Sequence, residues 1–167
     1  LIAIGKGDVP EEHWFRMART FPRAFDWQSQ SPKDRVDQTV NGYTFPGGYY
    51  SWKGRNYLPS WGGSLFEALM PLLVLDELRY APASLGKNAL AHTELSRRFA
   101  REHLGYPVWG LSPSSAPNGD GYHEYGARIL GARGYPAGAV TPHAAALALL
   151  TEPVAATANL RQLAQRY

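Results

Sequence analysis

The sequence predicts an all-α domain whose helices are joined by long loops that carry short β-hairpins. Apolar side chains recur every three or four residues in five segments, a pattern typical of helices with one buried face. The segments 23–60 and 106–141 lack this period and are rich in Gly, Pro and aromatic residues, which favours loops and hairpins. With 167 residues, 44% of them hydrophobic, the chain can form a single domain with its own core.

Local signals set the expected element boundaries. Leu1 to Ile4 is strand-like, and a start without Met suggests a piece of a longer or processed protein. We expect Pro71 to kink the second helix, Asn88 to cap the third and Gly105 to end it. The predicted helices run from about Pro10 to Thr20, Ser64 to Tyr80, Asn88 to Leu104, Thr141 to Leu150 and Pro153 to Arg166.

Composition excludes several classes of function. The formal charge is only +3 and the basic residues are scattered, which argues against a nucleic-acid partner. The chain has no Cys, so it offers no disulfide and no thiolate metal ligand. The given sequence shows no signal-peptide pattern and no apolar run long enough to span a membrane, and a periplasmic or extracellular parent protein is compatible with it. Aromatic residues make up 13%, which suits either a core or a surface that stacks on ring-shaped ligands.

Glu67 is the one charged residue between Leu65 and Leu75. The spacing Ser64-x-x-Glu67 fits a capping box, in which serine and glutamate satisfy backbone donors at the start of a helix. A catalytic acid is the alternative, because apolar surroundings favour a protonated carboxyl, although the helix N-terminus favours the ionised form. Trp61-Gly62-Gly63 precedes the helix and allows another group to approach the backbone closely.

A second group of chemical side chains lies between residues 120 and 125. Asp120 and Glu124 could supply the second carboxylate that glycosidic cleavage requires, or they could be ordinary loop acids. A metal site of Asp120, His123 and His143 is a weaker interpretation, because no helical His-x-x-x-His pair is present. We therefore expect no metal and no cofactor.

Four motifs, in the same order, resemble the glucoamylase-like domain, the group of endo-β-1,2-glucanases of glycoside hydrolase family 144 and the related domain of cyclic β-1,2-glucan synthases. They are PSWGGSLFEALMP at 59–71, YPVWGLSPSS at 106–115, GYHEYG at 121–126 and VTPHA at 140–144. The resemblance implies that residues 1–167 are one domain, a C-terminal portion of a larger (α/α)6 toroid with its loops and hairpins at one end. The segment 23–60 is then a loop and hairpin insertion, and 106–141 is the active-site loop segment.

The resemblance also assigns roles. It places Glu67 at the position of the family's general acid, whereas Pro113 stands where the retaining synthases have a nucleophilic Glu. An inverting reaction would need another base, for which Asp120, Glu124 and Asp26 are candidates. The expected substrate is an oligo- or polysaccharide, with β-1,2-glucan favoured. The residues expected to bind it are Trp61, Trp109, Ser112, Tyr122, His123, Tyr125, Arg128 and His143.

Two further expectations concern partners and rival functions. Part of a toroid exposes apolar helix faces, so we predict a homodimer or a companion segment that covers them. The missing nucleophile at Pro113 also allows a non-catalytic glycan-binding or structural fragment.

Overall fold

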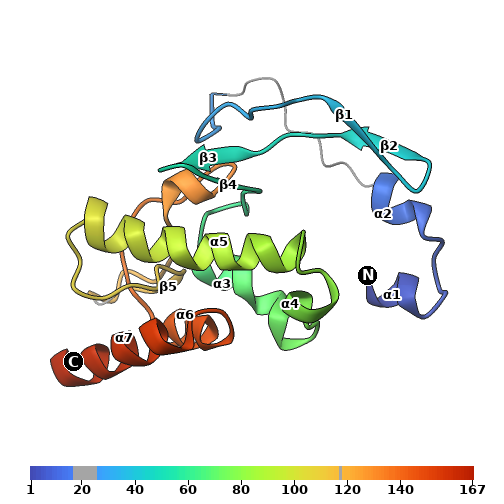
Figure 1. The fold of residues 1–167 in the computed structure, drawn as a ribbon. Coiled ribbons are helices and arrows are strands. Elements are labelled where there is room, and N and C mark those ends of the chain that lie inside the picture. The colour runs from blue at the N-terminus through green and yellow to red at the C-terminus, as the bar shows by residue number, and fades with distance from the viewer. Residues whose placement is uncertain (17–25, 117) are drawn as a thin grey trace.

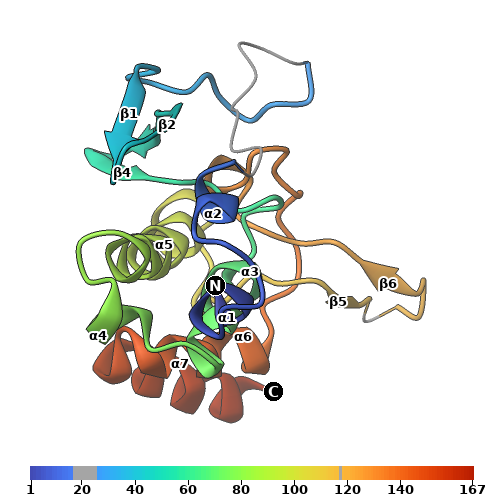
Figure 2. The same ribbon diagram turned by 90° about the vertical axis from the view of Figure 1, so that its right-hand side faces the viewer.

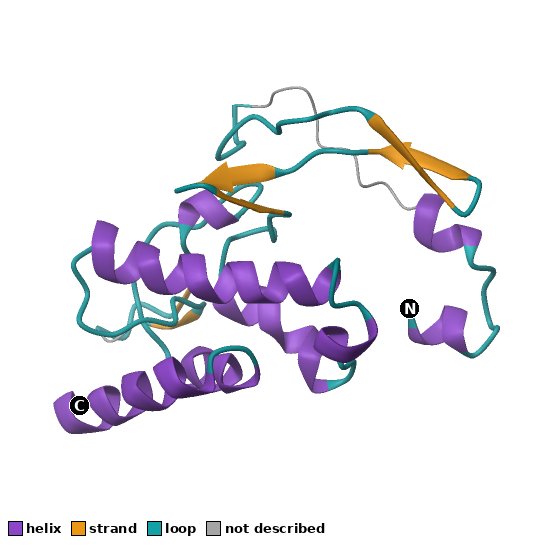
Figure 3. Cartoon of the chain, viewed as in Figure 1, coloured by secondary structure: helices purple, strands orange, loops and turns teal. Residues whose placement is uncertain are grey.

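The computed structural model describes residues 1–16, 26–116 and 118–167 (Figure 1). The chain is a small mixed domain in which 43% of these residues are helical (Figure 3). The predicted helices and hairpins are both present, so the class is mixed rather than all-α. Three antiparallel two-stranded hairpins account for the strands in the described part of the chain.

Helix α5 (Leu85–Arg98) is the centre of the fold and continues as a π-helical turn, Phe99–His103. On one side it packs against the hairpin of β3 (Tyr50–Trp52) and β4 (Arg55–Tyr57). On the other side it packs against α3 (Leu65–Leu69) and the C-terminal helices (Figure 1). The core on the hairpin side contains Tyr50, Tyr57, Leu95, Phe99, Leu111 and Leu130. The core on the other side contains Leu65, Leu69, Trp109 and a set of alanines.

The beginning of α5 corrects one expectation. Asn88 does not cap the helix, which begins at Leu85. Its side chain instead bonds the Leu58 backbone, accepting from the amide at 2.8 Å and donating to the carbonyl at 3.2 Å. The expected end at Gly105 is confirmed, because that glycine follows the π-helical turn with a φ of +69°.

The predicted helix from Ser64 to Tyr80 is interrupted. It consists of α3 (Leu65–Leu69), a 3₁₀ turn at Met70–Leu73 and α4 (Glu77–Tyr80). Pro71 cannot donate a backbone hydrogen bond, and Asp76 caps α4 by accepting from the Arg79 amide at 3.1 Å. The predicted disruption at Pro71 is confirmed as a break between elements.

Burial along this segment is lower than its almost wholly apolar sequence would suggest. Leu65 and Leu69 are fully buried, but Leu73 is 63% exposed and Val74 is 71% exposed. Leu90 on α5 and Val154 near the C-terminus are also exposed, although their helical spacing from other apolar residues suggests an inward position. The apolar sequence is therefore buried on only one side, and the dimer or companion segment expected to cover the rest stays a prediction.

The C-terminal helices follow the sequence closely. Thr141 caps α6 (Pro142–Leu147), which continues as a 3₁₀ turn, Ala148–Leu150. The last helix, α7, is Pro153–Arg166. Asn159 lies buried on α7 and bonds both backbone groups of Trp109, accepting from its amide at 3.0 Å and donating to its carbonyl at 2.7 Å. This side chain fixes the 106–111 segment to the last helix.

The hairpins lie around this helical centre. β1 (Asp37–Val40) pairs antiparallel with β2 (Tyr43–Pro46). In this register Asp37 lies opposite Pro46 and Val40 lies opposite Tyr43. β5 (Ser114–Ser115) and β6 (Tyr122–His123) form a hairpin that extends away from the helices (Figure 2). A 3₁₀ turn at Arg128–Leu130 follows.

The N-terminal segment differs from expectation. Leu1 to Ile4 was expected to be strand-like, but Ile2–Gly5 forms helix α1, because the chain bonds to itself from the Gly5 amide to the Leu1 carbonyl at 2.8 Å. Helix α2 (Glu12–Arg16) is the described part of the helix predicted over 10–20; residues 17–20 lie outside the described residues. Phe15 attaches α2 to the β1–β2 hairpin by stacking on Tyr43, with ring centroids 4.7 Å apart.

None of the helices in the described ranges is long and apolar enough to cross a membrane.

Replacing Asn159 with Ala should lower the free energy of unfolding by about 2 kcal/mol, because the Trp109 amide and carbonyl lose their partner while buried. Urea denaturation followed by tryptophan fluorescence measures the change. Gln165→Ala, at an exposed position of the same helix, is the control and should stay within about 0.5 kcal/mol. Equal stability of the two variants would contradict this role of Asn159.

His92 should make the fold sensitive to mild acid. Burial lowers its pKa, outweighing the hydrogen bond to the Leu58 carbonyl (2.7 Å) and the nearby charge of Glu67. Below the ordinary pKa of about 6.5, His92 becomes protonated in the unfolded chain while it stays neutral in the folded chain. Its contribution to the free energy of unfolding is therefore fully present above that pH and decreases as the pH falls below it. The slope contributed by this group is at most about 1.4 kcal/mol per pH unit.

His92→Gln should flatten the dependence of unfolding free energy on pH between about 6.5 and 5. His103→Gln removes an exposed histidine and serves as the control. Denaturation curves at several pH values give both slopes, and an unchanged slope in His92→Gln would refute the assignment.

Candidate active site around Glu67

The turn from Ser60 to Ser64 passes against the segment 126–135. Six backbone hydrogen bonds join them in the described structure. In the three shortest, the Ala132 amide donates to the Ser60 carbonyl at 2.7 Å, the Tyr135 amide to the Gly62 carbonyl at 2.8 Å and the Ala127 amide to the Gly63 carbonyl at 2.9 Å. Segments more than 60 positions apart in sequence are thereby held in one rigid unit.

Gly62 and Gly63 are required by this close approach. A Cβ at Gly62 would lie 2.0 Å from the Tyr135 ring, and one at Gly63 would lie 2.2 Å from the Ala127 carbonyl oxygen. Gly63 also has a φ of +76°, in the left-handed region that side chains disfavour. The expectation that these glycines admit another group is therefore correct: the Tyr135 ring lies against Gly62, and the Ala127 carbonyl lies against Gly63.

Glu67 is fixed by the start of helix α3. Its amide donates to Ser64 Oγ at 3.1 Å, as a capping box requires. Its carboxylate oxygen Oε2 accepts from the Gly62 amide at 2.8 Å, two residues before the cap, rather than from Ser64. The capping-box prediction is thus confirmed for the Ser64 hydroxyl. The Glu67 carboxylate bonds the Gly62 amide in place of the Ser64 amide, and the residue is half-buried beside the Trp61-Gly62-Gly63 turn.

Tyr135 connects Glu67 to a second carboxyl. Its side chain is 8% exposed, and burial raises the pKa of Tyr135 to about 12, with further contributions from the charges of Glu67 and Glu124 and from hydrogen bonding to both carboxyls. The hydroxyl therefore lies next to both acids and stays protonated at neutral pH. Sequence reasoning missed Tyr135; the available signal was an aromatic residue between Gly134 and Pro136.

The three candidate bases occupy different places. Glu124 follows β6 and lies at the Tyr135 hydroxyl, exposed to solvent. Asp120 lies in the turn of the β5–β6 hairpin, where Asn118 donates to its carboxylate. Asp26 is exposed beside Trp27. Of the three, only Glu124 shares a described contact with the neighbourhood of Glu67.

His143 and Ser112 lie close to each other, and His143 also contacts α3. His143 is exposed at the start of α6, and its Nε2 lies 3.2 Å from Ser112 Oγ and 3.4 Å from Thr141 Oγ1. Its ring meets that of Phe66 edge to face, with centroids 5.7 Å apart. Because Phe66 precedes Glu67, this places His143 next to the helix turn that carries the acid.

The predicted sugar-binding side chains divide into accessible and inaccessible ones. Trp61 is 51% exposed and Tyr122 is 70% exposed. The rings of His123 and Tyr125 stack on each other, with their centroids 5.9 Å apart. Arg128 is exposed at the start of its 3₁₀ turn.

Trp109 corrects the prediction that its ring stacks on sugar. It is 1% exposed and packs in the core with Leu65 and Leu69, so no ring face is open to a ligand. Ser112 is equally buried, and its hydroxyl reaches His143 rather than the surface.

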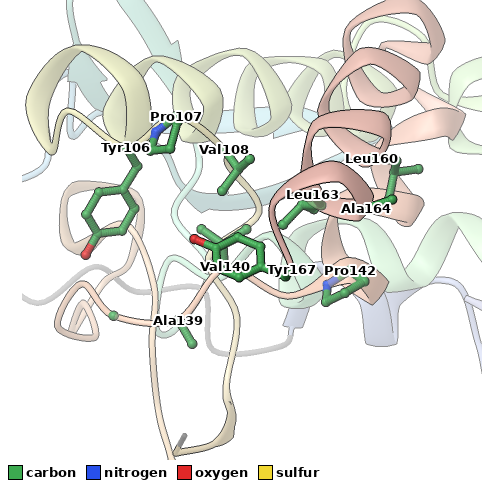
Figure 4. A pocket seen from close by; sticks show the side chains of 11 residues that line it. Tyr106, Pro107, Val108, Ala139, Val140, Pro142, Leu160, Leu163, Ala164 and Tyr167 are labelled. Atoms are coloured by element: carbon green, nitrogen blue, oxygen red, sulfur yellow. The ribbon is translucent and has the colours of Figure 1, made fainter.

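An apolar pocket of about 780 Å³ lies near the C-terminal end of α7 (Figure 4). Val108, Val140, Leu160 and Leu163 point into it, and its described lining has no carboxylate, His, Lys or Arg. It therefore offers no carboxylate pair for glycosidic cleavage within its described lining. Within the described ranges no three His, Asp or Glu side chains are grouped to hold a metal ion, so Asp120, His123 and His143 do not form such a site there.

Comparison with known proteins agrees with these motifs. The chain is 31% identical over 170 residues to the cyclic beta-(1,2)-glucan synthase NdvB of Rhizobium meliloti (strain 1021). That alignment covers 98% of this chain and 5% of the relative, so the chain spans a small part of that protein. Residues 30–167 match the family model Glycoamylase, described as "Putative glucoamylase". Because the match covers most of the sequence, the chain belongs to the Glycoamylase family.

Proposed function

We propose that this chain is a glycoside hydrolase domain that cleaves β-linked glucan, with Glu67 as its general acid. The observation that carries the proposal is the fixed carboxyl of Glu67, held by the Gly62 amide and facing a tyrosine shared with a second carboxyl. β-1,2-glucan is the favoured substrate, because the relative is named for that linkage.

Glu67 is suited to protonate a leaving oxygen. Oε2 is occupied by the Gly62 amide, which leaves Oε1 to carry the acidic proton toward the glycosidic oxygen. As that proton transfers, the bond from C1 to the oxygen breaks and positive charge develops on the sugar ring. The Glu67 carboxylate that remains is stabilised by the same amide and by the N-terminus of α3.

Glu124 is the candidate base. In an inverting reaction it takes a proton from water while the hydroxyl bonds to C1 on the face opposite the leaving group. Pro113 stands where the retaining relatives carry their nucleophile, so the pair Glu67 and Glu124 fits inversion better than retention. Asp120 and Asp26 are the alternative bases.

Tyr135 is a positioning residue for this pair. Its single O–H proton can be donated to only one carboxylate at a time, while its oxygen can accept from a protonated partner. Since its pKa is raised to about 12, it remains a donor at the pH of any ordinary assay. A hydroxyl shared in this way helps to hold both carboxyl groups in position.

A non-catalytic glycan-binding domain is the second candidate. Pro113 in place of the family's nucleophile favours it. It predicts binding of oligosaccharides, measurable by calorimetry, without formation of reducing ends on long incubation.

The wider architecture is also a proposal. We infer that the described helices are part of an (α/α)6 toroid and that the apolar side chains exposed on α3, its 3₁₀ turn and α7 are covered in the complete assembly. The support is that Met70, Leu73, Val74 and Val154 expose apolar surface whose burial would contribute about 25 cal/mol per Å².

Glu67→Gln should abolish release of reducing sugar from β-1,2-glucan, with kcat/KM falling about 10² to 10⁴-fold because the proton donor is lost. The backbone bond from Gly62 can be kept by the amide oxygen, so circular dichroism should show an unchanged fold. Glu12→Gln on α2 is the matched control and should keep full activity. Unchanged turnover in Glu67→Gln would reject the acid role.

Glu124→Gln should lower kcat/KM and remove the acidic limb of its pH profile, because that limb reports ionisation of the base. Asp120→Asn and Asp26→Asn are the comparisons and should retain the limb. If either of these loses it while Glu124→Gln does not, the base is assigned to that aspartate instead. Glycan anomers followed by NMR would show inversion directly.

A further inference from the structure

A second pocket of about 780 Å³ lies beside the Glu67 turn, between the β1–β2 hairpin and residues 58–61. Trp27 and Trp61 form part of its wall and are 37% and 51% exposed. Their ring centroids are 5.5 Å apart and the planes meet at 47°. The two indoles thus present an angled aromatic wall against which the C–H face of a pyranose ring can pack.

The rest of the wall carries hydrogen-bonding groups. Gln38 and Asp34 line it from the hairpin side. The Gln38 side chain passes over Gly47, where a Cβ would lie 3.0 Å from its Cγ, so the glycine makes room for the amide at this edge. The Asp34 carboxylate hydrogen-bonds the Tyr49 hydroxyl, which raises the pKa of Tyr49. The site thus combines aromatic faces with an amide and a carboxylate.

This combination selects a neutral, hydroxylated ligand. Amide and carboxylate groups can bond sugar hydroxyls, and the indoles cover the less polar ring faces. Asp34 is the one charged residue in the described lining, which contains no Lys, Arg or His. A negative charge without a basic partner disfavours phosphate and other anions.

The pocket is joined to the catalytic turn by one residue. Trp61 contributes its ring to the wall, and the next residue, Gly62, donates its amide to Glu67 Oε2 at 2.8 Å. Ser60 also lines the pocket, and its Oγ accepts from the Gly63 amide at 2.9 Å. The wall and the acid therefore belong to the same rigid turn.

We propose that this pocket is a subsite for a glucosyl unit of the glycan chain whose scissile bond lies at Glu67, with Trp27 and Gln38 as its determinants. The subsite rests on the proposed function for its ligand class. Its contacts are remote from the bond that breaks, so they contribute to substrate binding rather than to the chemical step.

Calorimetry tests the subsite without turnover. A β-1,2-linked glucohexaose is titrated into Glu67→Gln and into the same chain carrying Trp27→Ala, Gln38→Ala or Tyr80→Ala. Loss of the indole face in Trp27→Ala should raise the dissociation constant about tenfold, and loss of the amide in Gln38→Ala should raise it several-fold. Tyr80 is an exposed ring on α4 outside the pocket, so its removal should leave affinity unchanged.

Kinetics on the active chain separate binding from catalysis. Trp27→Ala should raise KM about tenfold with kcat unchanged, the pattern of a lost binding contact. The subsite is overturned if Trp27→Ala and Gln38→Ala bind the hexaose as tightly as their parent, or if the parent binds no oligosaccharide. If the unaltered chain releases no sugar but Trp27→Ala still weakens binding, hydrolysis fails as the function and the subsite stands.

Discussion

The close contact between the Gly62-Gly63 backbone and the segment 126–135 is the constraint on which the rest of the site depends. No side chain fits at either glycine, because the Tyr135 ring and the Ala127 carbonyl occupy the space. In this contact the Gly62 amide donates to the Glu67 carboxylate, and the Tyr135 hydroxyl lies next to the same carboxyl. Trp61, the residue before Gly62, lies at the surface. One backbone arrangement therefore positions the acid, its neighbour and an aromatic face.

The electrostatics of the site follow from this packing. Glu67 receives a backbone N–H and lies at a helix N-terminus, both of which stabilise negative charge. Tyr135 is buried between two carboxyls and therefore keeps its proton. The Tyr135 hydroxyl therefore links the two carboxyl groups by position, and it stays a hydrogen-bond donor toward them.

The helices around the site are only partly covered. Helix α5 is packed on both sides, whereas the 3₁₀ turn after α3 and the first turn of α7 leave Leu73, Val74 and Val154 exposed. Exposed apolar surface of this kind is uncommon on a finished domain unless it forms an interface. The chain spans about 5% of the length of the relative that it matches.

Local chemistry in the sequence determined several element boundaries and drew attention to Glu67. The Ser64 cap, the break at Pro71, the end at Gly105 and the start at Thr141 each depend on neighbouring residues, so they could be predicted. Contacts between distant segments could not be predicted in that way. Only the folded chain decided that Trp109 is buried, that Asn88 bonds Leu58 and that Tyr135 meets both Glu67 and Glu124, because each depends on packing across tens of residues.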